Sequence, residues 1–196
     1  MKILMVAPEA VPFVKVGGLA DVVGALTKEL SDKGHDVRLV LPKYQHLKHF
    51  ESAKLSKDSF MRVRMGVQDE YTRIWEAQYP DSKAQVYFFE YEAFFGSSSV
   101  YVGPSGNEAD NGYRFSFFSR ASLDFCYHMN WFPDVIHCHD WTTGLVPAFL
   151  NTNDFNETLG RAASVMTIHN LQHQGYCDRR VSVSYTHLRA HETRHY

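Results

Sequence analysis

Residues 2–42 begin with a buried-strand pattern, pass through a glycine-rich turn and a helical pattern, and end in a second strand pattern. Lys2–Pro8 holds a continuous apolar run that does not alternate, which is typical of a parallel strand covered on both faces. From Leu19 the apolar residues follow helical spacing up to Gly34, a residue type that ends helices. Val37–Leu41 is the second strand. A strand, a helix and a strand in this order predict a right-handed βαβ unit and an open, mostly parallel α/β sheet.

Downstream of this unit, strand and helix patterns alternate and are separated by polar connections. Residues 43–60 are polar and lysine-rich, and we expect a surface excursion there. Residues 62–67 and 71–77 favour two strands of an antiparallel hairpin that turns around Gln68–Glu70. The serine- and glycine-rich segment 97–107 predicts a long loop, either a lid or a plain connection. The other expected elements are strands at 84–91, 135–139 and 163–168, helices at 111–129 and 140–150, and a polar loop at 151–161.

The bulk composition is that of an ordinary globular protein. Apolar residues make up 44% and charged residues 21%, and the formal net charge of -2 gives no electrostatic reason to expect a nucleic acid partner. Cys126, Cys138 and Cys177 lack CxxC spacing, which argues against a disulfide framework or a structural zinc site and fits a reducing cytosol. The apolar start is too short to span a bilayer and has no signal-peptide pattern. We therefore expect a cytoplasmic protein with no membrane partner.

The segment Lys15–Asp21 places a cation, two glycines and a carboxylate between the first strand and the first helix. Unpaired N–H groups at a helix start bind anions, and glycine lets a ligand approach the backbone. Lys15 adds a mobile charge beside the N–H groups of Gly17 and Gly18. The second strand ends in Pro42-Lys43 rather than in an acidic ribose ligand, which disfavours a dinucleotide. The segment favours a phosphate-bearing small molecule; a plain turn, with a solvated lysine and a carboxylate that only favours the helix start, is the alternative.

Two later strand patterns also end in polar residues, namely His139-Asp140 and His169-Asn170. The carboxyl ends of parallel strands meet at one edge of an open sheet, so the three segments predict a single ligand crevice. His137 and His139 lie on the same side of a strand, but no third ligand has a convincing spacing for a metal ion. Hydrogen bonding to a substrate is the favoured interpretation for this strand end. His169 is either a buried structural histidine or a partner for a sugar hydroxyl.

Taken together, these segments resemble the bacterial glycogen/starch synthase family. The N-terminal signature of the family is similar to the opening MKILMVAPEAVPFVKVGGLADVVGAL. Its His-Asp-Trp segment is similar to PDVIHCHDWTTGLVPAFL, and its Thr-(Val/Ile)-His-Asn segment to VMTIHNLQHQG. The order and spacing agree from Met1 to about Gly175, and the three motifs together are highly specific.

The resemblance implies a retaining glucosyltransferase of the GT-B type, with two Rossmann-like lobes that carry helices on both faces of their sheets and face a common cleft. Such enzymes transfer glucose from ADP-glucose to the non-reducing end of an α-1,4-glucan. ADP-glucose is a substrate, and neither a cofactor nor a metal ion is implied. In this family Lys15 and the amides of Gly17 and Gly18 would bind the donor phosphate and help the nucleoside diphosphate to leave.

The resemblance also implies roles for the other strand-end residues. His169 matches the family histidine at the transferred sugar, where it would contact a hydroxyl group or a developing oxocarbenium-like centre. Asp21 and Asp140 match acidic positions that orient hydroxyl groups near donor and acceptor. His139 and Asn170 complete the expected substrate-binding set.

Two departures from the family bear on the domain organisation. Residues 1–180 resemble only the N-terminal lobe, and because the second lobe is absent we expect negligible activity from this chain alone. Residues 183–196 begin with a stretch that resembles a translated sequencing-library adapter, so we expect a non-native tail whose junction lies between Gly175 and Val183. Two other functions stay open: a nucleotide-dependent Rossmann oxidoreductase, and a non-catalytic glucan-binding module that uses the aromatic residues of segment 87–101.

Overall fold

The computed structural model of the chain describes residues 1–66, 68–106, 110–152, 154 and 156–175. These residues form a seven-stranded sheet in the order β3-β4-β5-β2-β1-β6-β7. The neighbouring strands from β5 to β7 are parallel, while β3 and β4 form an antiparallel hairpin that pairs with β5. In chain order the strands are β1 (Lys2–Val6), β2 (Asp36–Pro42), β3 (Lys54–Met65), β4 (Gln68–Gln78), β5 (Gln85–Glu90), β6 (Val135–His139) and β7 (Ala163–Thr167). The predicted mostly parallel α/β sheet with a hairpin is confirmed.

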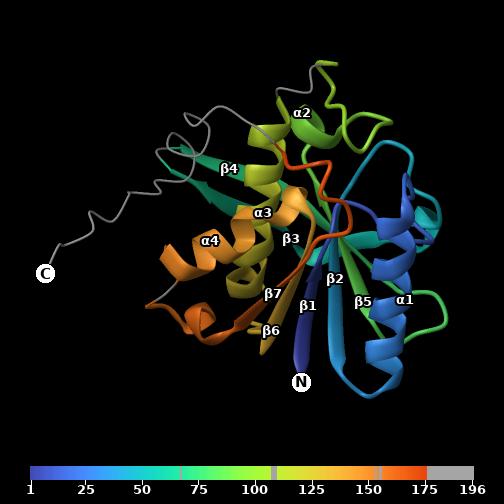
Figure 1. Ribbon diagram of the computed structural model, residues 1–196, viewed down its shortest axis with the longest axis vertical. Helices are drawn as coiled ribbons and strands as arrows, with labels where there is room; N and C mark the ends of the chain where they lie inside the picture. The colour runs from blue at the N-terminus through green and yellow to red at the C-terminus, as the bar shows by residue number, and fades with distance from the viewer. Residues whose placement is uncertain (67, 107–109, 153, 155, 176–196) are drawn as a thin grey trace, which may run out of the picture.

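Helices cover both faces of this sheet (Figure 1). One layer is α1 (Gly18–Asp32), and the other contains α3 (Asn111–His128) and α4 (Leu145–Thr152). β1 contributes side chains to both layers, because Ile3 and Met5 pack with α1 while Leu4 and Val6 pack with α3. This two-sided burial is the reason why its apolar run does not alternate. The shorter helical segments are α2 (Glu92–Phe95) and the 3-10 turns Phe50–Ser52, Trp141–Thr143 and Thr158–Arg161.

Helix α1 ends where the sequence predicts. Gly34 has φ 88°, a left-handed conformation that glycine adopts without steric cost. Its N–H donates to the carbonyl of Ser31 at 2.9 Å, and the N–H of His35 donates to the carbonyl of Leu30 at 3.2 Å. These two bonds make a Schellman motif, which satisfies carbonyl groups at the helix end and turns the chain into β2.

Three boundaries differ from the sequence-based expectations. β3 begins at Lys54, inside the expected excursion 43–60, because pairing with β4 extends the hairpin beyond the alternating segment. Met65 pairs with Gln68, so the hairpin turns before residues 68–70 and uses Gly66, whose φ is 79°. The expected helix 140–150 begins as a 3-10 turn and continues as α4 only from Leu145.

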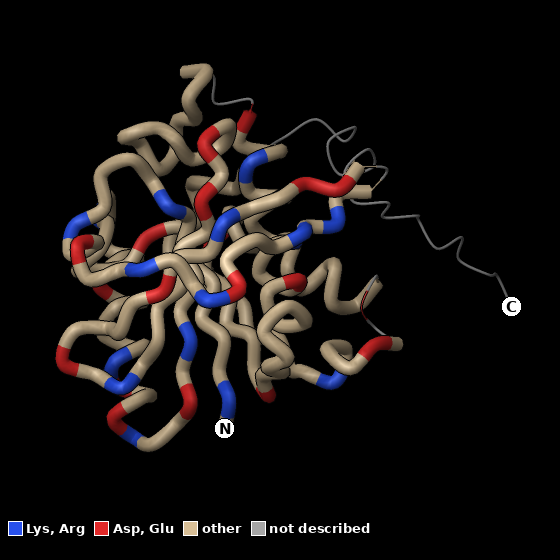
Figure 2. The backbone as a smooth tube through the Cα atoms, turned by 180° about the vertical axis from the view of Figure 1, so that it is seen from behind, with Lys and Arg blue, Asp and Glu red and all other residues tan. Residues whose placement is uncertain are grey.

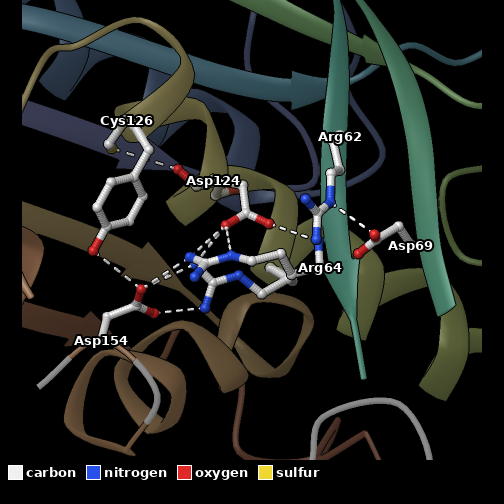
Figure 3. A network of polar contacts seen from close by, with 9 residues as sticks. Arg62, Arg64, Asp69, Asp124, Cys126 and Asp154 are labelled. Atoms are coloured by element: carbon white, nitrogen blue, oxygen red, sulfur yellow. Dashed lines mark hydrogen bonds and ion pairs between the residues drawn. The ribbon is translucent and has the colours of Figure 1, made fainter. Parts of the chain in front are cut away.

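A network of arginine and aspartate side chains ties the hairpin to α3 and to the segment after α4 (Figure 3). Arg120 donates to Asp154 at 2.5 Å and to Asp124 at 2.9 Å. Arg64 on β3 reaches the same two carboxylates, at 2.7 Å and 3.1 Å. The side chains of Arg120 and Asp154 are 3% and 0% exposed, so this pair joins α3 to the segment after α4 out of contact with water, while the half-exposed Arg64 links β3 to both carboxylates.

Elsewhere acidic and basic residues are interspersed along the backbone (Figure 2). Within the described part of the chain, no helix combines the length and the apolar character needed to cross a bilayer.

Gly24 lies where α1 makes its close approach to the loop after β1. A Cβ atom at this position would meet the side chain of Val11, the carbonyl oxygen of Val11 at 2.7 Å and the hydroxyl of Tyr79 at 2.9 Å. We expect Gly24→Ala to lower the free energy of unfolding by about 1–3 kcal/mol through overpacking, even though alanine is the better helix former. Urea unfolding followed by circular dichroism measures the change. The matched control is Gly18→Ala, where no atom lies within 4 Å of the added Cβ; a Gly24→Ala variant as stable as this control would contradict the prediction.

Candidate functional site

The carboxyl ends of β1, β6 and β7 border one cleft of about 460 Å³. β1 lies between β2 and β6, so the strand order reverses here, and open α/β sheets bind ligands outside such a switch point. The residues that line the cleft come from the loops that follow these strands, from the start of α1, from the loop before α3 and from the first residue of α3. They are Glu9, Val16, Gly17, Gly18, Leu19, Tyr101, Asn111, Asp140, Trp141, Asn170 and His173. The three predicted strand-end segments therefore do meet at a single crevice.

The buried side chain of Glu9 holds the glycine turn through hydrogen bonds to its backbone. It is 1% exposed, and its Oε2 accepts hydrogen bonds from the N–H of Val16 and from the N–H of Gly17, the latter at 3.1 Å. Its Oε1 accepts the hydroxyl of Tyr101 at 2.9 Å. The N–H of Gly17, predicted to bind phosphate, is thus already bonded to a carboxylate. The free N–H groups of this turn begin with Gly18, the first residue of α1, because the first N–H groups of a helix have no partner inside it.

Lys15 and Asp21 form an ion pair at the mouth of the cleft. The Nζ of Lys15 lies 2.7 Å from both carboxylate oxygens of Asp21, and the two side chains are 52% and 53% exposed. Exposed ion pairs of this kind contribute about 0–1 kcal/mol to stability, so an anionic ligand can replace Asp21 as the partner of Lys15 with little loss of free energy. Neither residue lines the cleft itself, whereas Gly17 and Gly18 do.

Asp140 has an unusual backbone conformation, with φ 57° and ψ -177°. This region is populated almost only by glycine and costs another residue on the order of 1–3 kcal/mol. Contacts from two sides hold it there: the N–H of Asp140 donates to the carbonyl of Thr167 at 2.9 Å, and its own carbonyl accepts the N–H of Thr143 at 3.1 Å. Its Oδ1 accepts the backbone N–H of His169 at 2.6 Å. The strained residue therefore joins the ends of β6 and β7 at the floor of the cleft.

His137, His139 and His169 form a row of imidazole rings beside this floor. The ring of His139 stacks on that of His137 at 4.3 Å and on that of His169 at 5.3 Å. The Nδ1 of His139 lies 3.0 Å from the Nε2 of His169, and the Nε2 of His137 lies 2.7 Å from the hydroxyl of Thr167. His139 is fully buried and His169 is partly buried, and neither of them is among the residues that line the cleft. Among the described residues, no three His, Cys, Asp or Glu side chains are grouped to hold a metal ion.

The loop before α3 is fixed over the glycine turn by a buried arginine. Arg114 is 0% exposed, and it donates to the carbonyls of Phe94 and Val100, at 2.5 Å and 3.2 Å, and to the side chain of Asn111 at 2.5 Å. Asn111 in turn donates to the carbonyl of Tyr101 at 2.8 Å. Burial and the nearby Glu9 carboxylate raise the pKa of Tyr101 well above its usual value, so its hydroxyl remains a hydrogen-bond donor. The described part of the predicted loop is thus anchored, and it contributes an aromatic side chain to the cleft.

Outside the segment Lys15–Asp21, five cleft residues were not predicted as site residues: Glu9, Tyr101, Asn111, Trp141 and His173. Tyr101 does end the aromatic segment 87–101 considered for glucan binding. Glu9 carried a usable signal, because it directly follows the Pro8 that closes a buried strand pattern. Trp141 directly follows Asp140 in the His-Asp-Trp segment, which is predicted to lie at the crevice. Tyr101 reaches the cleft from a loop with no periodic pattern, and Asn111 is the first residue of the predicted helix 111–129. Only the fold brings these two residues to the cleft.

Burial makes the stability of this region depend on pH. Desolvation, with His137 and His169 nearby, lowers the pKa of His139 to about 3. Between pH 6.5 and 3 the unfolded chain therefore takes up a proton at this position while the folded chain does not. We expect stability to fall as the pH falls through this range, by up to about 1.4 kcal/mol per pH unit from this one group.

His139→Asn isolates that contribution, because asparagine does not titrate. The advantage in unfolding free energy of the wild-type chain over the variant should shrink as the pH is lowered from about 7 to about 5, where unshifted histidines titrate. Urea unfolding at a series of pH values measures it. A difference that stays constant with pH would show that His139 binds protons equally in both states.

Comparisons with known proteins place these residues in context. The family model described as "Starch synthase catalytic domain" matches residues 2–196. Glycogen synthase 1 of Geobacter sulfurreducens is 44% identical over 177 residues, which are 89% of this chain and 35% of that protein. Glycogen synthase of Treponema denticola is 42% identical over 181 residues, again 89% of this chain and 35% of that protein. The chain thus spans about a third of the length of these relatives.

Solved structures agree with the sequence matches. The catalytic domain of starch synthase IV from Arabidopsis thaliana, solved with ADP and acarbose bound, superposes with a TM-score of 0.79 at 31% identity, covering 88% of this chain and 34% of that one. A sucrose-phosphate synthase from Thermosynechococcus elongatus superposes with a TM-score of 0.52 at 14% identity, a likeness of fold alone.

Proposed function

The chain belongs to the starch synthase catalytic domain family, and from this premise we propose that it is the N-terminal lobe of a retaining glucosyltransferase of the glycogen/starch synthase type. The complete enzyme would transfer glucose from ADP-glucose to the non-reducing end of an α-1,4-glucan, in the cytoplasm and without a metal ion or other cofactor. The observation that carries the proposal is the convergence of three strand ends, each with polar side chains, on one cleft at the switch point of the sheet.

One side of this cleft suits the diphosphate of the donor. Gly18 and the residues after it offer N–H groups at the start of α1, where the helix dipole also favours an anion. Lys15 stands beside them, held only by an exposed ion pair with Asp21. As the bond to glucose breaks, negative charge grows on the leaving diphosphate. Donors already fixed in place would stabilise that charge more in the transition state than in the ground state.

The other side suits a sugar. Asp140 and Asn170 provide hydrogen-bond acceptors and donors for hydroxyl groups, and Trp141 provides an aromatic surface. Tyr101 lies near that surface, with its ring centroid 6.4 Å from that of Trp141. The backbone N–H of His169 donates to Asp140, and its ring Nε2 lies 3.0 Å from the Nδ1 of His139. We assign to His169 the contact with the transferred glucose, and to Asp140 the orientation of its hydroxyl groups.

The rival functions receive less support. The Rossmann oxidoreductase lacks an acidic residue at the end of β2, which closes with Pro42. The glucan-binding module relied on aromatic residues of segment 87–101, but Phe88, Phe89 and Phe95 are fully buried in the core. Tyr101 is the aromatic residue of that segment that reaches the cleft.

The experiment that tests the proposal joins this lobe to a second one. Residues 1–175 replace the matching segment of the Geobacter sulfurreducens relative, and incorporation of glucose from ADP-glucose into a maltooligosaccharide is measured. We expect transfer by the chimera and none by the isolated chain above a Lys15→Ala background, because a single lobe leaves the cleft open to water. A folded chimera that binds ADP-glucose without transferring glucose would contradict the proposal, and so would turnover by the isolated chain.

A further inference from the structure

The buried His139 at the end of β6 contacts the ring of His169, the residue proposed to contact the transferred glucose. His139 touches His169 ring to ring, with its Nδ1 3.0 Å from the Nε2 of His169. A neutral imidazole has one N–H and one bare nitrogen, so one of these two atoms donates and the other accepts. The direction of this bond decides which nitrogen of His169 carries its hydrogen.

The environment of the Nε2 of His139 indicates which of its ring nitrogens carries the hydrogen. Its Nε2 is buried and has no hydrogen-bond partner among the described residues. A buried N–H without a partner is rarer in proteins than a buried acceptor without one, because acceptors are more often left partly unsatisfied. The hydrogen of His139 therefore belongs on Nδ1, where a partner exists, and the bare nitrogen is the one left alone.

The surroundings hold the His139 ring in this orientation. The hydroxyl of Thr143 accepts the backbone N–H of His139 at 2.7 Å and donates to its carbonyl at 3.0 Å. His137 packs on one face of the ring, and its own Nε2 is engaged by Thr167. Burial lowers the pKa of His139 to about 3, which keeps the ring neutral near pH 7.

We infer that His139 is a positioning residue that fixes the tautomer of His169. The Nδ1–H of His139 donates to the Nε2 of His169, so His169 carries its own hydrogen on Nδ1 and can offer only an N–H donor to a ligand. The Nε2 of His169 is occupied and cannot act as a base. This inference rests on the proposed role of His169 and deepens it, since a hydrogen-bond donor suits an oxygen atom of the transferred sugar.

The tautomer can be measured without substrate. Long-range proton–nitrogen correlation spectra of the chain with ¹⁵N-labelled histidine distinguish a protonated ring nitrogen from a bare one, and a His169→Gln variant assigns the His169 signals. In spectra recorded at pH about 8, we expect a protonated Nδ1 and a bare Nε2 on His169. A protonated Nε2 on His169 in the wild-type chain would overturn the inference by itself.

Three variants test the cause. His139→Phe keeps a ring but removes the donor, and we expect His169 to shift toward the Nε2–H form that free imidazole side chains prefer. His139→Asn keeps an N–H donor near the position of Nδ1 and should retain the wild-type signals. His137→Phe, the matched control, preserves stacking on His139 and should leave His169 unchanged.

Each outcome of the variant series decides the inference. The inference would be refuted if the Nε2 of His169 stayed bare in His139→Phe. It would also be refuted if His169 changed to the Nε2–H form in His137→Phe. If His139→Phe does not fold, the wild-type tautomer and the His139→Asn signals still decide the matter. Because the spectra use the ligand-free chain, a wrong tautomer would leave the proposed glucosyl transfer standing, and an inactive chimera would leave the tautomer as measured.

Discussion

Asp154→Asn lowers the free energy of unfolding by about 3 kcal/mol, near the cost of breaking a buried ion pair, because the buried Arg120 loses one of its two carboxylate partners. Arg120 is 3% exposed and depends on Asp154 for its 2.5 Å hydrogen bond, while Arg64 and Tyr127 bond the other oxygen at 3.1 Å and 3.2 Å. An amide presents one oxygen and no charge to these groups. Two guanidinium groups would then share the single remaining carboxylate of Asp124. Urea unfolding followed by tryptophan fluorescence measures the loss.

The control for this prediction lies on the same hairpin. Asp69 pairs with Arg62 at 2.7 Å, but the two side chains are 35% and 61% exposed, and Figure 3 places this pair beside the buried network. Asp69→Asn should change stability by no more than about 1 kcal/mol, because exposed ion pairs contribute little. Equal losses in the two variants would show that burial of the network is not what matters.

Lys15→Ala in the chimera lowers the rate of glucose transfer by about 10²- to 10³-fold, the range expected when one donor to a developing negative charge is removed. The effect should fall on kcat more than on KM, because the lysine interacts more strongly with the leaving diphosphate than with the intact donor. In the free protein Lys15 is paired with Asp21, and the exposure of both groups makes that partner easy to exchange. Initial rates over a range of ADP-glucose concentrations separate the two parameters.

Lys28→Ala serves as the matched control for Lys15→Ala. Lys28 is a lysine of α1 that pairs with Asp32, and it lies toward the C-terminal end of the helix, away from the glycine turn that Lys15 adjoins. Its removal should leave the rate of transfer unchanged. An equal loss of transfer rate in both variants would show that the effect comes from the net charge of the protein. A Lys15→Ala variant with an unchanged rate would show that Lys15 has no part in the proposed mechanism.

Much of this architecture follows from local patterns in the sequence. The βαβ unit was predictable because Leu19 to Gly34 combines helical spacing with a residue that ends helices, and both flanking runs are buried on two faces. The meeting of three strand ends at one cleft follows from the rule for open parallel sheets. The predicted GT-B lobe is confirmed by its superposition on the starch synthase IV domain.

Other features depend on contacts that no local pattern encodes. Residues 54–60 read as a polar excursion because β3 is an edge strand whose register shifts between Leu55 and Phe60, and in that stretch only Ser56 is buried. The helix predicted from residue 140 begins late because Asp140 adopts a positive φ that no helix contains. The predicted non-native tail at 183–196 lies outside the described residues, and both the tail and its junction between Gly175 and Val183 remain predictions.

The carboxylate of Glu9 is an internal hydrogen-bond acceptor for the glycine turn. Because it already occupies the N–H groups of Val16 and Gly17, the turn does not need a ligand to take its shape. The conformational entropy of ordering these residues is lost when the chain folds and not when a substrate arrives. Preorganisation of this kind lowers the entropy that remains to be lost when an anion binds to the N–H groups at the start of α1.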